Sequence, residues 1–200
     1  MGLRSLLLVC ISALLAGACS SGQPSAAQAQ PAYRPTATIK DIMDSVIDPN
    51  ADAVWESVAT TVDATGIHEK YPQNDEEWKT LRRNTITLLE GSNLLQIPGR
   101  LVAKPHEKSE NPGIELEPEE MQRLIDQDKE SFYKLANALH DTVMVTLKAI
   151  EAKDKEALLE SGTAIDQACE NCHVKYWYPN EAQTQAEQRQ PVPPPNSEKK

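Results

Sequence analysis

The chain has 200 residues, of which 20 are basic and 30 acidic, and its formal net charge is −10. This length accommodates one domain or at most two small ones. No cluster of Lys and Arg stands out, which argues against a nucleic-acid partner. Hydrophobic residues make up 40% of the chain but aromatic residues only 4%. An aliphatic core of this kind favours the packing of helix on helix.

The first 18 residues have the pattern of a signal peptide. Arg4 precedes the apolar run SLLLVCISALLAGA, which is too short for a membrane span. The next stretch, LAGACSSG, resembles a bacterial lipoprotein box, in which Cys19 is acylated and becomes the mature N-terminus. Ordinary signal cleavage after Ala18 or Ala29 is the alternative. We therefore expect an exported protein on the periplasmic side of a bacterial membrane, lipid-anchored through Cys19 or otherwise soluble in the periplasm.

Two segments lack the composition of a packed core. Residues 19–36 are rich in Ser, Ala, Gln and Pro, which predicts a flexible tether. Residues 180–200 are polar and Pro-rich, which predicts a disordered tail. The folded domain is therefore expected over residues 37–179.

The first two predicted helices begin at recognisable caps. Thr38 and Asp41 form a capping-box pattern, and Pro49 is expected to kink or break the first helix near Asp48. The second helix follows Asn74 and is expected to end at Pro98-Gly99. Apolar residues recur at helical spacing in both: Ile39, Met43, Val46, Val54 and Val58, then Trp78, Leu81, Leu88 and Leu95.

The other two predicted helices follow a long loop over residues 99–117. The third starts with Pro118 at its first position and is expected to continue unbroken to Ile150. A turn near Lys153-Asp154 leads to the fourth, which Pro179 ends. Short turns between long amphipathic helices favour antiparallel neighbours, and no segment shows the alternating pattern of a strand. The predicted fold class is all-α, an antiparallel four-helix bundle.

The motif CENCH, residues 169–173, is the strongest functional signal in the chain. A thioredoxin-type dithiol requires its first cysteine at a helix N-terminus after a strand, whereas Cys169 lies well inside the last predicted helix. A zinc site requires four ligands, and Cys169, Cys172 and His173 supply three. Two interpretations remain: a pair of buried cysteines beside a surface histidine, or the attachment motif of a c-type haem.

The spacing suits haem attachment. Thiols at positions i and i+3 lie one turn apart on one helix face, where they can add to the two vinyl groups of haem. The next residue, His173, would then direct its imidazole at the iron. The expected export supports this interpretation, because covalent haem attachment in bacteria takes place outside the cytoplasmic membrane.

A CxxCH motif on the last helix of a four-helix bundle resembles the class II cytochromes c, the cytochrome c′ superfamily. The resemblance covers residues 37–179 and is most specific in CENCHVKYWYP and in the Met-bearing segment IKDIMDSVIDPNADAVW. It implies one covalently bound haem c, with thioether bonds at Cys169 and Cys172 and with His173 as the proximal iron ligand. It also implies electron exchange with periplasmic or membrane redox proteins, and pairing of two copies into a homodimer.

Members of this family differ in the sixth ligand of the haem iron. Some family members leave the distal face open and bind NO or CO, whereas others ligate the iron with a Met of the first helix. Met43 matches that Met, and an up-down-up-down topology places it at the same end as His173. A core side chain is the alternative role for Met43. Positions along an unbroken third helix can be counted from the turn near Asp154. His140 and Met144 would lie closer to that turn than the iron, and Met121, about 50 Å from the turn, would lie beyond the iron.

Several other residues have two interpretations each. Gly91, Ser92 and Asn93 either make room for the haem or pack between helices, and Arg100 either pairs with a haem propionate or is solvated. Tyr176 and Trp177 are expected to form an apolar wall. His68 and His106 lie in predicted loops, and either is a further candidate for an iron ligand.

The expected function is that of a monohaem electron carrier. A five-coordinate cytochrome c′ that binds NO or CO is the first alternative, and a structural lipoprotein without haem is the second. An enzyme is not expected, because the sequence offers no Ser/His/Asp set, phosphate loop or pair of buried carboxylates.

Overall fold

The computed structural model describes residues 33–180. This part of the chain is predominantly helical, with one small two-stranded sheet, which confirms the helical class expected from the sequence. The predicted signal peptide, Cys19, most of the tether and nearly all of the tail lie outside the described residues. In chain order the elements are α1 Ile39–Ile42, π-helix η1 Met43–Ile47, α2 Asp48–Trp55, β1 Ala59–Asp63, β2 Gly66–Lys70, α3 Asp75–Leu94, α4 Pro118–Gln127, α5 Lys129–Ala152 and α6 Lys155–Tyr176.

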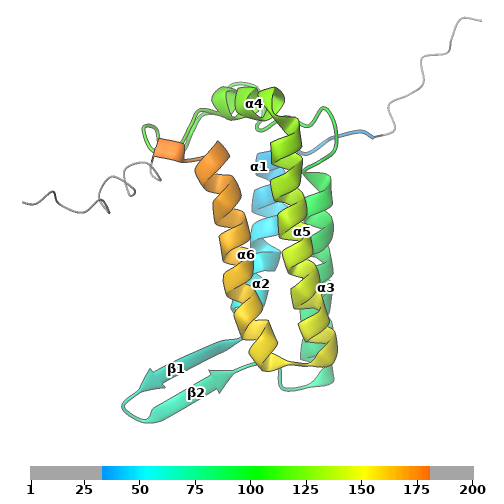
Figure 1. The fold of residues 1–200 in the computed structure, drawn as a ribbon, viewed down its shortest axis with the longest axis vertical. Helices are drawn as coiled ribbons and strands as arrows, with labels where there is room; N and C mark the ends of the chain where they lie inside the picture. Colours follow the sequence, from blue (N-terminus) through cyan, green and yellow to red (C-terminus); the bar gives the residue numbers. More distant parts are fainter. Residues whose placement is uncertain (1–32, 181–200) are drawn as a thin grey trace, which may run out of the picture. The chain divides into compact units, whose positions relative to one another are not determined.

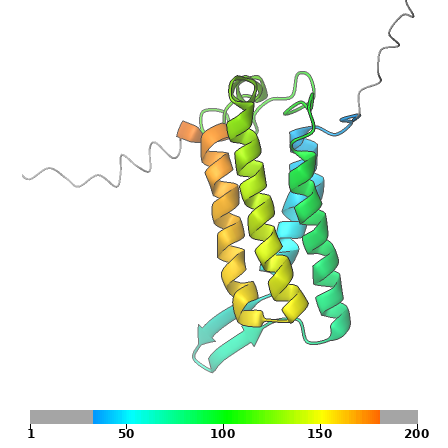
Figure 2. The ribbon, with the colours of Figure 1, turned by 45° about the vertical axis from the view of Figure 1, so that its right-hand side comes forward.

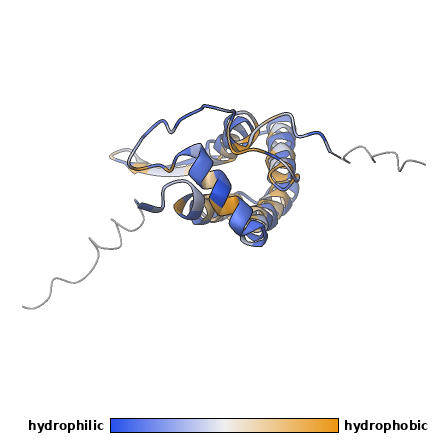
Figure 3. Cartoon of the chain, turned by 90° about the horizontal axis from the view of Figure 1, so that it is seen from above, coloured by the Kyte–Doolittle hydropathy of each residue, from blue (hydrophilic) through white to orange (hydrophobic). Residues whose placement is uncertain are grey.

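The segment α1–η1–α2 runs side by side with α3, α5 and α6 (Figures 1 and 2). α5 packs against α3 and α6, while η1 and α2 pack against α3. Seen from above, hydrophobic residues turn toward the middle of these helices (Figure 3). The apolar side chains with no exposed area come from all four segments: Val54, Leu88, Val143, Leu158 and Ile165. Each contributes about 1.5–3 kcal/mol by burial, so this aliphatic interior is the main stabilising feature.

The helix starts expected from the sequence are confirmed. The Thr38 hydroxyl accepts a hydrogen bond from the backbone N–H of Asp41, and the Asp41 carboxylate accepts one from the N–H of Thr38, both at 3.0 Å. Asn74 accepts from the N–H of Glu77, also at 3.0 Å, at the start of α3. Pro118 occupies the first turn of α4. These caps satisfy N–H groups that lack partners inside a helix.

Of the kink or break expected near Asp48, the break does not occur. The backbone N–H of Asp48 bonds the carbonyl of Met43, five residues back, so the chain passes through one π-helical turn and continues as α2. Pro49 falls in the first turn of α2, where its missing N–H costs little. The Asn50 side chain donates to the Val46 carbonyl at 2.7 Å and satisfies one acceptor of the irregular turn. The helix therefore changes its hydrogen-bond pattern without ending.

The predicted unbroken third helix is also wrong. Asp128 leaves the helical conformation, with φ −143° and ψ 68°, and separates α4 from α5. Its carboxylate accepts a hydrogen bond from the N–H of Ser131 at 3.0 Å, so Asp128 is the N-cap of α5. α4 consequently lies across the ends of the neighbouring helices (Figures 1 and 3).

A β-hairpin lies between α2 and α3, so the expectation that no strand occurs is wrong. β1 and β2 pair antiparallel with Val62 opposite Ile67, and Gly66 follows the turn with φ +130°. The β-branched run of β1 favours a strand over a helix. The hairpin projects at the end of the helices opposite to α4 (Figure 1), and both of these apolar side chains are exposed.

Candidate cofactor site

The CENCH motif occupies the last two turns of α6. Cys169 and Cys172 are free thiols, both partly buried. Burial raises the pKa of Cys169 to about 11, with a smaller contribution from Asp48. Burial also raises the pKa of Cys172 to about 12, with a smaller contribution from Cys169. Redox-active dithiols have lowered thiol pKa values, so this environment argues against dithiol cycling.

The His173 imidazole is enclosed by aromatic rings at the end of α6. Its centroid lies 5.0 Å from that of Trp177 and 5.8 Å from that of Tyr178, both in edge-on arrangements. Burial lowers the pKa of His173, although Glu170 opposes this effect. The imidazole is therefore neutral near pH 7, which is the form that binds metals.

A cavity of about 270 Å³ lies at this end of the helices. The residues that line it include Met43 of η1, Met121 and Ile125 of α4, Phe132 of α5, and Cys172, His173 and Tyr176 of α6. Cys169 lies one turn earlier on α6 and does not line the cavity. The structure thus brings three of the four expected haem-binding residues, Met43, Cys172 and His173, around one space.

Met121 also lines this cavity, contrary to the expectation that it lies far beyond the iron. That expectation assumed an unbroken helix, whereas the break at Asp128 turns α4 over the cavity. His140, Met144, His68 and His106 do not line it. Met43 and Met121 are therefore the two methionines that line the cavity together with His173. The helix break at Asp128 explains the position of Met121.

Tyr176 and Trp177, which were expected to form a wall, both line the cavity. Tyr176 is 5% exposed, and its ring packs edge-on against Phe132 with centroids 5.5 Å apart. Its hydroxyl oxygen is buried and lacks a hydrogen-bond partner within residues 33–180. Leaving such a group unpaired costs about 1–3 kcal/mol.

The cavity rim carries charges of both signs. Asp44, Asp48, Glu110 and Glu115 line the cavity together with Lys40 and Lys108. Lys40 lies 2.6 Å from Glu110, and Lys108 lies 3.7 Å from a carboxylate oxygen of Glu117 and of Glu119. A bound group with its own carboxylates would therefore meet two lysines in an otherwise acidic surrounding.

Two residues considered for the haem environment have other partners. The Arg100 guanidinium is buried and donates to the carbonyls of Ala37 and Leu94, so it ties the loop to the helix ends. A Cβ on Gly91 would lie 3.1 Å from Ile47 and 3.2 Å from Val46, so Gly91 serves the close packing of α3 on η1. Neither residue lines the cavity.

The lining includes side chains of the kinds that ligate haem. Within residues 33–180, no group of three or more His, Cys, Asp or Glu side chains is placed to hold a metal. A thiol, an imidazole and two thioethers are the groups through which proteins hold haem c. The volume of about 270 Å³ lies just below the usual range of ligand pockets, about 300–1,000 Å³.

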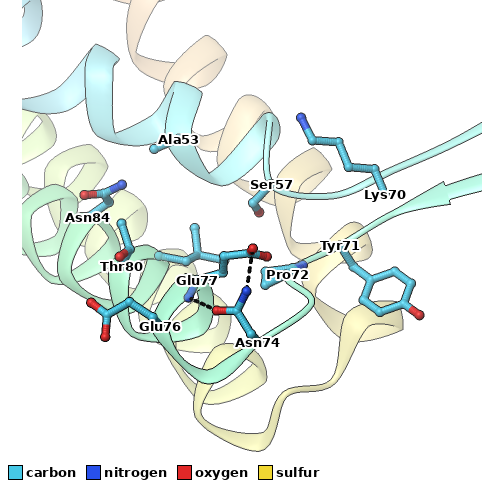
Figure 4. Close-up of a pocket in the computed structure, with 11 residues that line it drawn as sticks. Ala53, Ser57, Lys70, Tyr71, Pro72, Asn74, Glu76, Glu77, Thr80 and Asn84 are labelled. Carbon is cyan, nitrogen blue, oxygen red and sulfur yellow. Dashed lines mark hydrogen bonds between the residues drawn. The ribbon is translucent and has the colours of Figure 1, made fainter.

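A second hollow, of about 520 Å³, lies between α2, α3 and the base of the hairpin. Figure 4 shows its polar lining, including Ser57, Lys70, Tyr71 and Asn84. The Asn74 and Glu77 side chains in this view bond each other in the cap of α3. We assign no chemistry to this hollow, because its carboxylates already serve the cap and ion pairs with Arg83 and Lys79.

Comparison with protein-family models, with curated proteins and with solved structures finds no match. Residues 33–180 contain no helix that combines the length and the apolar character needed to cross a membrane.

Proposed function

We propose that the protein is an exported monohaem c-type cytochrome that carries electrons, built on an antiparallel four-helix bundle. Haem c is attached through Cys169 and Cys172, with His173 as the proximal ligand and Met43 as the distal ligand. The observation that supports this most is that one cavity is lined by Cys172, His173 and Met43, which are 130 positions apart in sequence at the widest.

Each residue has a distinct role in this proposal. The two thiols form covalent thioether bonds, and their high pKa values keep them protonated until attachment. Neutral His173 supplies a nitrogen to the iron. Met43 supplies the thioether that raises the reduction potential and closes the last coordination position, which favours electron transfer over ligand binding. The haem supplies the one-electron redox chemistry.

The N-terminal signal sets the proposed location. A lipid on Cys19 and the 19–36 tether would hold the domain at the periplasmic side of a bacterial membrane. Its partners would be periplasmic or membrane redox proteins, and a homodimer is a further proposal. Cys19 and residues 20–32 lie outside the described residues, so these statements rest on the sequence.

The alternative function is that of a five-coordinate haem protein that binds NO or CO. It is supported by the partly buried position of Met43, which packs against the hydrophobic core and has an adequate role there. A structural lipoprotein without haem is the more distant alternative, in which CENCH has no cofactor.

The test is an optical spectrum of protein matured in a periplasm with haem-attachment machinery, ferric and ferrous, before and after CO. Wild type is expected to be low-spin, to show the sulfur-to-iron charge-transfer band and to ignore CO. Met43→Ala is expected to become high-spin and to bind CO. Met121→Ala is the matched control, because it removes the other thioether of the cavity, and its spectrum should equal that of wild type.

Other outcomes select other functions. A wild-type protein that is already high-spin and binds CO would favour the NO/CO-binding function. Loss of the charge-transfer band in Met121→Ala alone would assign the distal position to Met121. A colourless protein with both thiols free, under conditions that mature a control cytochrome, would leave only the structural lipoprotein.

A further inference from the structure

The irregular turn η1 lies inside a continuous helix and begins at Met43. The Met43 carbonyl accepts the N–H of Asp48, five residues on, whereas an α-helix pairs residues four apart. Turns of this kind are rare and occur often at functional sites. An α-helical turn would need one residue fewer, so a physical cause must hold this turn open.

Pro49 supplies that cause. In an unbroken α-helix, the ring of Pro49 would collide with the carbonyl four residues back, which belongs to Ser45. Asp48, whose N–H closes the π-turn, is the residue immediately before Pro49. One extra residue in the turn relieves the collision and allows the helix to continue as α2.

The burial of the side chains shows what the extra residue changes. Ile42 and Ile47 are both 2% exposed although they are five positions apart, whereas Ala51 and Val54 follow Ile47 at the regular spacings of four and three. In a regular α-helix the core position before Ile47 would belong to Met43, four residues back. The π-turn gives this position to Ile42, and Met43 lies at the cavity instead.

Both sides of η1 are fixed by other segments. The N–H of Ile39 in α1 bonds the carbonyl of Leu101 at 2.8 Å, and the Trp55 side chain in α2 donates to the carbonyl of Gly162 at 3.0 Å. One residue of α-helix corresponds to a rotation of about 100°. The turn between these two anchors therefore decides which side chain of the first helix faces the cavity.

Resting on the proposed function, we infer that Pro49 is a positioning residue for the iron ligand. It maintains the π-turn that keeps Ile42 in the core and turns the Met43 thioether toward the haem. Pro49 does not line the cavity itself, so its effect is exerted through Met43.

The test is the optical spectrum of Pro49→Ala in the haem-loaded protein. Alanine permits an α-helical turn, in which Met43 takes the core position and leaves the iron. The sulfur-to-iron charge-transfer band is expected to be lost and CO is expected to bind, as in Met43→Ala. Pro118→Ala is the matched control, because Pro118 also lies in a first helical turn and lines the cavity, and α4 contains no π-turn. Its spectrum should equal that of wild type.

Deletion of Ser45 in the Pro49→Ala background provides a rescue. Ser45 is exposed, so its deletion shortens the turn by one residue without removing a core side chain. Ile42 would then precede Ile47 by four positions, and a regular α-helix would again present Met43 to the cavity. The charge-transfer band should return. If Pro49→Ala alone does not fold, this double variant is measured by itself, and a high-spin spectrum that responds to CO would overturn the inference.

NMR of the ferrous, low-spin protein reports on the turn directly, because scalar coupling across a hydrogen bond identifies the N–H that bonds the Met43 carbonyl. This N–H should change from that of Asp48 in wild type to that of Ile47 in Pro49→Ala. A Pro49→Ala protein that keeps the charge-transfer band, or keeps the bond from Asp48, would overturn the inference. Failure of the proposed function is distinct, because wild type would then lack the haem spectrum or the charge-transfer band.

Discussion

The effect on stability of replacing a glycine by alanine depends on which side chain the added methyl group meets. Gly91 and Gly162 show this. A Cβ on Gly91 would meet two β-branched side chains at 3.1 and 3.2 Å, and one of them, Ile47, is 2% exposed. A Cβ on Gly162 would meet the Trp55 ring at 3.3 Å, and Trp55 is 36% exposed. Stiff buried neighbours cannot move aside. The Trp55 ring is partly exposed and can shift by a small amount, although its Nε1–H donates a hydrogen bond to the Gly162 carbonyl at 3.0 Å.

Gly91→Ala is therefore expected to destabilise the protein, while Gly162→Ala is expected to be close to neutral. Alanine in a helix interior gains about 1 kcal/mol over glycine, and overpacking costs about 1–3 kcal/mol. Together these effects lower the free energy of unfolding of Gly91→Ala by about 1 kcal/mol. Denaturant unfolding of the two variants measures the difference, and a Gly91→Ala protein at least as stable as Gly162→Ala would contradict this account.

Lys108 and Lys104 form a matched pair on one loop. Lys108 lines the cavity, whereas Lys104 pairs with Asp41 at 2.9 Å outside it. In the haem-loaded protein, Lys108→Gln should lower the reduction potential, because a nearby positive charge favours the less positive ferrous iron. Lys104→Gln removes the same charge and should shift the potential less. Equal shifts in a voltammetric titration would show that only net charge matters.

At the scale of elements, the sequence was sufficient where local chemistry decides. Thr38 with Asp41, Asn74 with Glu77, and Pro118 all mark helix starts through bonds made within one turn. The hairpin was missed because its apolar pair, Val62 and Ile67, is isolated in two five-residue strands with no buried face. No alternation of buried and exposed positions was available to reveal it.

The same distinction applies to the candidate site. A short motif and antiparallel topology were enough to predict that Cys172, His173 and Met43 lie at the same end of the helices. The position of Met121 was not, because it depends on where α4 and α5 meet at Asp128. The helical spacing from Ile125 to Phe132 continues across that point and conceals the Asp128–Ser131 cap.

Asp128 and Asp154 allow a test of the α4–α5 break. Each caps a helix by accepting from a backbone N–H three residues on, at 3.0 Å. Replacement by Ala should cost about 1 kcal/mol of stability at either position. Only Asp128→Ala should also increase hydrogen exchange in α4. Alanine favours continuation of one helix through residue 128, which would move α4 away from its place over the cavity. Mass spectrometry measures this exchange. If exchange in α4 is unchanged in Asp128→Ala, or is raised equally in Asp154→Ala, the result contradicts this role.

At the scale of the whole molecule, the net charge of −10 makes mutual repulsion of carboxylates a general cost. Asp44, Asp48 and Asp52 recur every four residues along η1 and α2 and therefore share one helix face. The pKa of Asp48 is raised above 3.8, first by burial and then by Asp44 and Asp52. Asp75 is the opposite case: a hydrogen bond from Lys153 lowers its pKa.

These opposite shifts predict opposite responses to pH. Because the folded-state pKa of Asp48 is raised, its contribution to stability is present below pH 3.8 and is lost as pH rises through the folded-state value. Asp48→Asn should therefore increase the free energy of unfolding at pH 7, by less than about 1 kcal/mol at a half-exposed site. The gain should vanish near pH 3 and decrease with added salt, which screens Asp44 and Asp52.

Asp75→Asn is the control of opposite sign. The folded-state pKa of Asp75 is lowered, so its contribution is present above pH 3.8 and is lost as pH falls through the folded-state value. Its replacement should reduce stability at pH 7 and have less effect in acid. Unfolding curves of both variants between pH 3 and pH 7 provide the measurement. Stability changes of the same sign at pH 7 would show that net charge alone, and not the local surroundings of each carboxylate, governs the response.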